Sequence, residues 1–548
     1  MADSSGTKDV RSSVDAVHVE TADRRLEPRA EPQAHGTVQL LQGGSVVLIP
    51  TPSPDPKDPL NLPKWHKFLI VFIVASYSAT SVLCTSGMGS VFPSVLKEYA
   101  PSEATRATDL LTYPTLFMGI GNLLSMPLSV TVGRRPVFLA SLVLLVVSGI
   151  WCAFPALVSS HIAGRNFYSI AAGQSEALAP YIVEEIHFLH ERSAKLSWFI
   201  GIQTTLTAGM FVATTYIVPA RGTKWWYLII TFLNVAILIL SLVFVVETKY
   251  DRPEDADRGE VHLKLDETGH VSKNGDSEMI FSVTTRQNHQ LQPEVFGQRT
   301  WRHDLQVFHF KPEWKRTLAF YKYAFQSLCL ANIVWVLLLN GTFLGIYVYQ
   351  ASTFATILMS PPYSFKSGWL GYVQLVQVLD SVIMVPILGY GSDLVARSMS
   401  KRRNGLFQPE YRLITWSLPI ALAVLSCVLY GQAGAHPDRW HWMTIVAPYN
   451  VCFFAFLGAN LIGITYVVDS FPSKAGPLLL VICAGRGFIS FGLSYSTVPL
   501  IKLTGYNGAM NIFAIISGVM GALAIPVYFF GARVRLWATN RLWPEVTV

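Results

Sequence analysis

Long apolar runs alternate with short polar turns along most of this chain. A run of about 20 apolar residues is long enough for a helix that crosses a lipid bilayer. Such segments are expected to be helical, because lipid offers the backbone no water for hydrogen bonding. Twelve runs are visible, at roughly 67–88, 108–130, 136–156, 161–183, 196–218, 225–246, 324–350, 369–391, 411–431, 441–466, 477–500 and 508–531.

The twelve runs fall into two groups of six, which indicates an internal duplication. We therefore predict an all-α membrane protein with twelve transmembrane helices in two pseudo-symmetric six-helix bundles. Residues 1–64 mix Ser, Thr, Pro and both signs of charge without apolar periodicity, so this tail is expected to be disordered. The predicted parts are a tail at 1–64, a first bundle at 65–250, a connector at 251–322, a second bundle at 323–531 and a tail at 532–548.

Composition and charge support a membrane protein and set its orientation. The chain of 548 residues is 51% hydrophobic and only 14% charged, against about 25% charged in soluble domains. Short loops rich in Lys and Arg usually face the cytoplasm. The densest lie at 134–135, 192–195 and 397–403, all on one side of the predicted topology. Both termini are therefore expected in the cytoplasm, and the net charge of +7 reflects topology and not a nucleic-acid partner.

Two basic turns occupy equivalent places in the two halves. Gly133 with Arg134 and Arg135 forms one turn, and the other contains Asp393 and Arg397. Arginines at such places can bond the carbonyls at helix ends and nearby carboxylates. We expect a pair of ionic latches that close the cytoplasmic side, with Asp469 as a further latch acid. The alternative is that these charges only set the orientation.

The motifs along the chain resemble the major facilitator superfamily, in particular its twelve-span fungal drug:proton antiporter branch. The resemblance covers roughly residues 58–537 and includes a subgroup with carriers of polyamines and other organic cations. It implies the major facilitator fold, alternating access, a small-molecule substrate and a proton gradient as driving force. It rests on the stretches 58–65, 133–136, 165–173, 176–180, 188–192, 247–250, 362–365, 409–413 and 465–472, in that order.

Two positions depart from the pattern of the family. The loop motif usually has an aspartate three residues before its glycine, and here that residue is Val130. The first latch must therefore use another acid, or be weaker than the latch of the second half, where Asp393 is present. The fifth-span antiporter motif normally contains a Gly-Pro step, which the stretch 209–215 lacks. The second departure keeps proton symport open beside antiport.

Charged residues inside the spans are the best candidates for the transport path, because each is costly in lipid and must face a cavity or a partner. Glu176 is the first candidate to bind a proton or a cationic substrate, and the alternative is a structural bond to a neighbouring helix. Asp380 is the second, and its alternative is a pair with Arg486. The predicted substrate and proton site consists of Glu176, Asp380, Arg165, Arg486, Asn340, Asn460 and Gln377.

Enzyme signatures are missing from the sequence. No phosphate-binding G-x-x-x-x-G-K-[ST] loop occurs, and Ala194 stands where a zinc-protease motif beginning at His190 needs its second histidine. We therefore expect no enzyme activity, no metal and no cofactor. The favoured function is export of a drug or secondary metabolite by a monomer in the plasma membrane. The alternatives are symport of organic cations or polyamines, and a solute receptor that does not transport.

Overall fold

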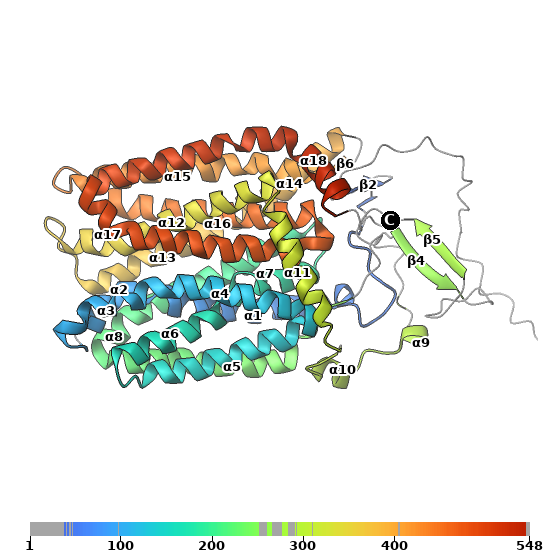
Figure 1. Ribbon diagram of the computed structural model, residues 1–548, viewed down its shortest axis with the longest axis horizontal. Coiled ribbons are helices and arrows are strands. Elements are labelled where there is room, and N and C mark those ends of the chain that lie inside the picture. The colour runs from blue at the N-terminus through green and yellow to red at the C-terminus, as the bar shows by residue number, and fades with distance from the viewer. Residues whose placement is uncertain are drawn as a thin grey trace, which may run out of the picture. The chain divides into compact units, whose positions relative to one another are not determined.

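Helices make up most of the described residues in the computed structural model (Figure 1). The structure describes residues 38–39, 41–42, 45–46, 48–96, 98–250, 260–265, 277–282, 291, 293–309, 311–403 and 406–543. Short strands pair in antiparallel twos: β1 (Val38–Gln39) with β6 (Leu406–Phe407), β2 (Leu41–Gln42) with β3 (Ser45–Val46), and β4 (Glu260–Leu265) with β5 (Ser277–Ser282). The all-α class predicted from the apolar runs is confirmed.

The first half contains eight helices and three short 3₁₀ turns. They are η1 (Pro59–Asn61), α1 (Lys64–Ser86), α2 (Met88–Leu96), η2 (Pro101–Glu103), α3 (Ala104–Ala107), α4 (Asp109–Val132), α5 (Arg134–Ala153), α6 (Val158–Ala172), η3 (Gly173–Ser175), α7 (Leu178–Glu185) and α8 (Arg192–Phe244). The fourth apolar run is thus split into α6 and α7 by the turn at η3.

The connector and the second half also consist mainly of helices in their described residues. Their elements are α9 (Pro293–Phe296), α10 (Trp301–Leu305), α11 (Trp314–Ser327), α12 (Ala331–Met359), α13 (Ser367–Met384), the π-helical turn η5 (Val385–Tyr390), α14 (Gly391–Arg402), η6 (Pro409–Trp416), α15 (Ser417–Ala435), α16 (Met443–Ser470), η7 (Pro472–Lys474), α17 (Ala475–Ala522) and α18 (Ala524–Arg541).

Two very long helices each contain two predicted runs. α8 turns at Gly222 (φ +79°) and α17 turns at Gly505 (φ +69°), in a backbone region that side chains with a Cβ rarely adopt. Among the described residues, nine helices are long and apolar enough to cross a membrane, or ten with one bent pair. Since α8 counts once there and the split fourth run not at all, the fold is consistent with twelve spans.

Large apolar side chains stay exposed on the outer faces of the helices. Phe232 is 69% exposed and Phe529 also 69%, whereas α16 has 89% of its most apolar stretch buried. Apolar surface of this kind is unfavourable in water and suits the hydrocarbon of a bilayer. The exposed faces and the number of apolar helices identify a multi-pass membrane protein.

The halves meet along two helix pairs, α4 with α17 and α8 with α13. A Cβ added to Gly487 would lie 3.4 Å from Cα of Gly119 and 3.2 Å from the carbonyl oxygen of Thr115. Small residues at such crossings let helix backbones approach closely in membranes. The two halves are therefore packed tightly along the α4–α17 contact.

Three predicted boundaries need correction. Residues 48–63 lie inside the tail predicted to be disordered, yet Leu48 and Asp58 are buried there and the Leu189 amide donates to the carbonyl oxygen of Ile49 at 2.7 Å. Most of residues 1–47 lie outside the described part. Helix α11 crosses the predicted start of the second bundle, and α18 runs ten residues into the predicted C-terminal tail. There, buried Arg535 pairs with Glu410 at 2.6 Å, which explains why the helix continues.

Candidate functional site

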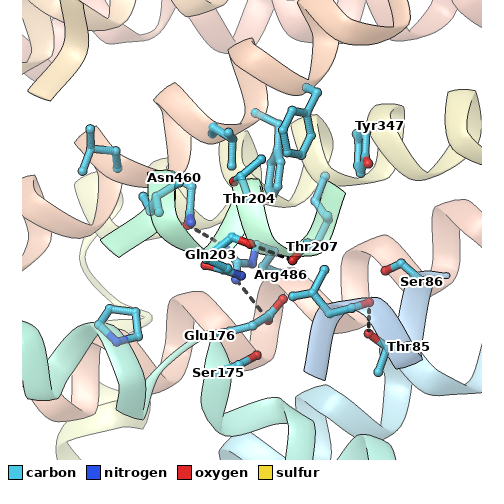
Figure 2. Close-up of a pocket in the computed structure, with 18 of the residues that line it drawn as sticks. Thr85, Ser86, Ser175, Glu176, Gln203, Thr204, Thr207, Tyr347, Asn460 and Arg486 are labelled. Carbon is cyan, nitrogen blue, oxygen red and sulfur yellow. Dashed lines mark hydrogen bonds and ion pairs between the residues drawn. The ribbon is translucent and has the colours of Figure 1, made fainter. Parts of the chain in front are cut away.

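A cavity of about 150 Å³ lies between the two halves. Its wall is mostly apolar and comes from α1, α4, α8 and the fourth span on one side, and from α12, α13, α16 and α17 on the other. An apolar cleft with a few oriented polar groups is the usual form of a small-molecule site. Figure 2 shows those polar groups, which include Ser86, Gln203, Thr204, Thr207 and Asn460 around Glu176 and Arg486.

An ion pair joins the two halves inside this cavity. A carboxylate oxygen of Glu176 lies 3.0 Å from a guanidinium nitrogen of Arg486, and the side chains are 19% and 2% exposed. Arg486 also donates a hydrogen bond to the amide oxygen of Asn460 on α16. The structure therefore brings three of the predicted site residues together (Figure 2).

The irregular backbone of the fourth span places Glu176 at the cavity. α6 ends at Ala172, the turn η3 follows, and Glu176 stands between this turn and α7. A Cβ on Gly173 would lie 2.4 Å from the carbonyl oxygen of Met118, so a glycine is needed where the turn packs against α4. The carbonyl oxygen of Glu176 accepts a hydrogen bond from the thiol of Cys483, which adds a second contact between the halves.

Aromatic rings cover the second-half wall around Tyr347. Its ring stacks on Tyr449 with centroids 5.6 Å apart and lies 5.1 Å from Phe453. The predicted residue Gln377 lines the cavity and donates to the Tyr347 hydroxyl at 3.4 Å. Amphipathic rings can hold apolar parts of a ligand and can also stack on a cation.

The other predicted site residues lie away from this cavity wall. Arg165 is buried in the first half, where it donates to the carbonyl oxygens of Leu110, Cys84 and Thr85 and to the Tyr227 hydroxyl, at 3.0–3.1 Å. Asn340 donates to the carbonyl oxygen of Val336 in its own helix. These bonds indicate packing roles, so Arg165 and Asn340 are not carried into the proposed site.

Asp380 stands apart from the pair in the cavity. The alternative expectation, a pair between Asp380 and Arg486, does not hold, because Arg486 pairs with Glu176. Among the described residues, the Oδ2 atom of Asp380 is buried and has no hydrogen-bond partner. Asp380 therefore keeps its capacity to bind a proton or a cation.

A second ionic cluster joins the halves at the end of the bundle that carries the basic turns, here called the basic end and marked by Arg134, Arg192 and Arg412. Asp469 of α16 is fully buried and accepts from Arg192 of α8 at 2.9 Å and from Arg412 of η6 at 2.7 Å. Arg412 also binds Asp393 at 2.8 Å. This structure therefore has its basic end closed.

Two hydrogen bonds extend this closure. Asp393 accepts from the backbone amide of Ala194 at 3.2 Å, and Arg397 donates to the carbonyl oxygen of His190 at 2.8 Å. Both bonds cross from the second half to the first. The second basic turn thus lies at a contact between the halves, together with the acid at position 469.

Within the described part of the chain, the partners of the first basic turn lie in the first half and the connector. Arg134 pairs with Glu185 at 2.6 Å, and Glu247 accepts from the backbone amides of Arg134 and Arg135 at 2.9 and 3.2 Å. The Arg135 side chain donates to the carbonyl oxygens of Leu242 and Gln306, both at 2.7 Å. Gly133 (φ +123°) leaves room for Glu247, since a Cβ would lie 2.4 Å from its carboxylate.

Four residues of these clusters were absent from the predicted gate: Arg192, Arg412, Glu185 and Glu247. Arg192, Arg412 and Glu247 stand inside the sequence stretches that carry the family resemblance. Their signal was a charge at the end of a span, opposite a charge of the other sign on a different span. Only the fold shows which of these charges meet.

Comparison with known proteins agrees with this architecture. The family model of the Major Facilitator Superfamily matches residues 74–477 of the chain. The chain belongs to the major facilitator superfamily. Members of this superfamily are transporters of small molecules and not enzymes, so the chain is a membrane transporter.

Several fungal members are similar over nearly their full length. An uncharacterized MFS-type transporter of Schizosaccharomyces pombe is 22% identical, covering 93% of this chain and 91% of the relative. Protein HOL1 of Saccharomyces cerevisiae is also 22% identical, over 90% of each chain. Efflux pump radE of Floropilus chiversii is 22% identical over 88% of this chain and 83% of the pump.

Solved structures of the superfamily have the same fold. The proton:xylose symporter XylE aligns with a TM-score of 0.57 and 13% identity over 85% of this chain and 95% of its own. The human organic anion transporter MFSD10 aligns with a TM-score of 0.54 and 12% identity over 84% and 100%. At such low identity the likeness concerns the fold and does not extend to the substrate.

Proposed function

We propose that this transporter exports a small organic compound in exchange for protons. In this proposal the chain has twelve spans, and its two halves give alternating access to the site. The observation that carries the proposal is the ion pair between Glu176 and Arg486, because it joins the halves inside the cavity. An ion pair at this place is broken when the carboxylate takes up a proton. Proton binding and the contact between the halves are then linked at one residue.

The cycle follows from the chemistry of this pair. A compound with a hydrogen-bonding group competes with Arg486 for the Glu176 carboxylate, while its apolar part contacts the rings around Tyr347. A proton that reaches Glu176 from the opposite side removes the negative charge and releases the compound. Loss of that proton to the cytoplasm restores the pair and resets the site.

The basic end is assigned to the cytoplasm in this proposal. The densest Lys and Arg loops lie there, in agreement with the positive-inside rule. The closed basic end then corresponds to a state in which cytoplasmic access is blocked by Asp469 and its two arginines. Both termini are cytoplasmic in this assignment, and we place the protein as a monomer in the plasma membrane.

Export is supported by the apolar wall and by the name of one relative. The cavity wall is mostly apolar, with hydroxyl and amide groups around an ion pair, which suits an amphipathic drug or secondary metabolite. The relative radE is named an efflux pump. We assign the chain to the drug:proton antiporter branch, and its similarity to this fungal pump supports the assignment.

A second candidate is uptake of organic cations or polyamines by proton symport. It is supported by two acidic residues in spans, Glu176 and Asp380, together with the aromatic wall around Tyr347. A cation can bind carboxylates and also the faces of aromatic rings. In this case substrate and proton move in the same direction.

Vesicles separate the two candidates. Inside-out and right-side-out vesicles containing the protein are incubated in a medium with radiolabelled candidates, including a polyamine and a hydrophobic drug, with and without a pH gradient. Antiport predicts accumulation in acid-loaded inside-out vesicles, and symport predicts uptake into right-side-out vesicles from an acidic medium. Accumulation that ignores the gradient would refute proton coupling, and absence of any solute movement would favour a receptor.

The role of Glu176 is tested in the same vesicles. Glu176→Gln keeps the shape of the side chain and removes its charge and its titration. We expect gradient-driven accumulation to fall at least tenfold, while exchange of labelled for unlabelled compound continues. A variant with normal rate and normal pH dependence would remove Glu176 from the mechanism. Glu191→Gln, which makes the same change at a partly exposed acid outside the cavity wall, controls for the loss of a charge and should leave transport unchanged.

A further inference from the structure

A second cavity, of about 610 Å³, opens at the basic end and contains a buried acid without a partner. Glu184 of α7 lines it and is 3% exposed. Among the residues the structure describes, neither of its carboxylate oxygens has a hydrogen-bond partner. Its neighbour in the chain, Glu185, pairs with Arg134 instead.

The groups that face Glu184 come from several elements. Its own helix contributes Glu185 and Tyr181, and the other elements contribute Arg192 (α8), Asp469 (α16), Arg412 (η6) and Cys483 (α17). The cavity beside Glu184 is also lined by the basic residues Arg134, Lys249, Arg316 and Lys474. Among these groups, Arg192 is a first-half cation with a hydrogen-bond donor to spare. Its Nη1 binds Asp469 at 2.9 Å, but its buried Nε has no acceptor within the described part of the chain.

With the basic end closed, Glu184 has no hydrogen-bond partner among the described residues, and the arginines that face it, Arg192 and Arg412, are both paired with Asp469. A buried charge that lacks a partner costs several kcal/mol, and a neutral carboxyl group costs much less. When the basic end opens, Arg192 leaves Asp469, because these two residues belong to different halves. Arg192 and Glu184 belong to the same half, so the released guanidinium can pair with the carboxylate.

We propose that Glu184 is a proton-binding site of the gate, which holds a proton while the basic end is closed and releases it when Arg192 changes partner on opening. The proton leaves to the cytoplasm through the adjoining cavity and returns from the same side on closing. It is therefore not transported, and it makes the gate sensitive to cytoplasmic pH. The inference rests on alternating access in the proposed function but not on the role of Glu176.

The sign of the effect follows from linkage. The closed form binds one more proton than the open form, so acid favours closure and alkali favours opening. Between the pKa values of Glu184 in the two forms, the closed-to-open ratio changes by up to about tenfold per pH unit. Titration of this one residue thus predicts the direction in which pH shifts the closed-to-open ratio, and the largest change of that ratio per pH unit.

The test uses distances between spin labels at the basic end. Labels at Lys64→Cys on α1 and Lys401→Cys on α14 report the separation of the two halves, since both lysines are exposed. Cys329 is changed to Ser because it is the exposed native cysteine, whereas the other five are buried. The full chain in lipid nanodiscs is measured by double electron–electron resonance from pH 5.5 to 8.5, in a Glu176→Gln background.

We expect the short-distance population of the parent to decline as pH rises. Glu184→Gln should keep the short distance at every pH, and Glu184→Leu should do the same if the amide variant is not folded. Glu191→Gln, a partly exposed acid of the neighbouring turn, should keep the parent's response. A parent with no pH response in the Glu176→Gln background, or a Glu184→Gln protein with the parent's response, would refute the gate site and leave the proposed function standing.

Discussion

Asp469 is the most informative single residue of the closed basic end. It is fully buried and accepts from two arginines, one from each half, at 2.9 and 2.7 Å. Asp469→Asn keeps the shape of the side chain but removes the charge that compensates both. Removal of one partner from a buried pair costs roughly 3–5 kcal/mol.

The structure indicates how this cost divides between the closed and the open form. Arg412 still has Asp393 at 2.8 Å in both forms, because the two residues lie in the same half. Arg192 loses its charged partner only in the closed form, since opening exposes it to water and to Glu184. We therefore expect the closed form to lose about 2–3 kcal/mol relative to the open form, and the closed-to-open ratio to fall roughly 30- to 150-fold.

The assay is the same pair of labels at positions 64 and 401. Asp469→Asn should convert the main distance population from short to long at neutral pH. The matched control is Glu410→Gln, which breaks an equally buried pair with Arg535 at 2.6 Å inside the second half. This control should lower the melting temperature to a similar extent and leave the distances unchanged. Equal distance shifts in both variants, or none in Asp469→Asn, would refute the assignment of Asp469 to the gate.

Three further predictions concern single sites. Gly133→Ala should lower the free energy of unfolding by about 1–3 kcal/mol in thermal melts, because φ is +123° and the Cβ would meet Glu247. The comparison is Gly209→Ala, where the Cβ meets nothing within 4 Å and the free energy of unfolding should rise by up to about 1 kcal/mol. Arg165→Lys should lower the melting temperature strongly, because the guanidinium group donates to three carbonyl oxygens. The pH dependence of transport by the folded fraction should stay normal, and a shifted pH profile would return Arg165 to the transport site. Tyr347→Ala should raise KM for the transported compound at least tenfold in transport assays, and Tyr347→Phe less than threefold, because the ring and not the hydroxyl covers the cavity wall. Equal increases of KM in the two variants would contradict this.

The fold was predictable from hydropathy to a large degree. Membrane helices need long apolar runs, so the runs that became α8 and α17 were visible although each pair forms one bent helix. The prediction was less accurate at the ends of the bundles, where local hydrogen bonds order segments that are not apolar. The segment at 48–63 looks polar, but Asp58 satisfies its own turn by accepting from the backbone amides of Leu60 and Ser53. Such local capping leaves no periodic signal in a sequence.

The site was predictable only as a set of charges in spans. Rarity in lipid singled out Glu176 and Arg486 correctly as residues that need partners, but it also singled out Arg165, whose partners are backbone carbonyl oxygens. Sequence spacing cannot tell these cases apart, because a carbonyl oxygen is present at every position. Only contacts between spans far apart in the chain distinguish an arginine that holds helices together from one that faces a cavity.

The two basic turns differ for a reason that the sequence contains in part. With Val130 in place of the usual aspartate, the first turn has no acid of its own to offer across the gap between the halves. Arg134 therefore pairs within its half with Glu185, and the second half supplies both Asp393 and Asp469 to the shared contact. Arg192 is the only first-half side chain among the described residues that forms an ion pair with these acids. Among the described residues, the ion pairing that closes the basic end therefore uses one cation of the first half, beside the hydrogen bonds at Ala194 and His190. The proposed gate site links the release of this cation to proton binding at Glu184.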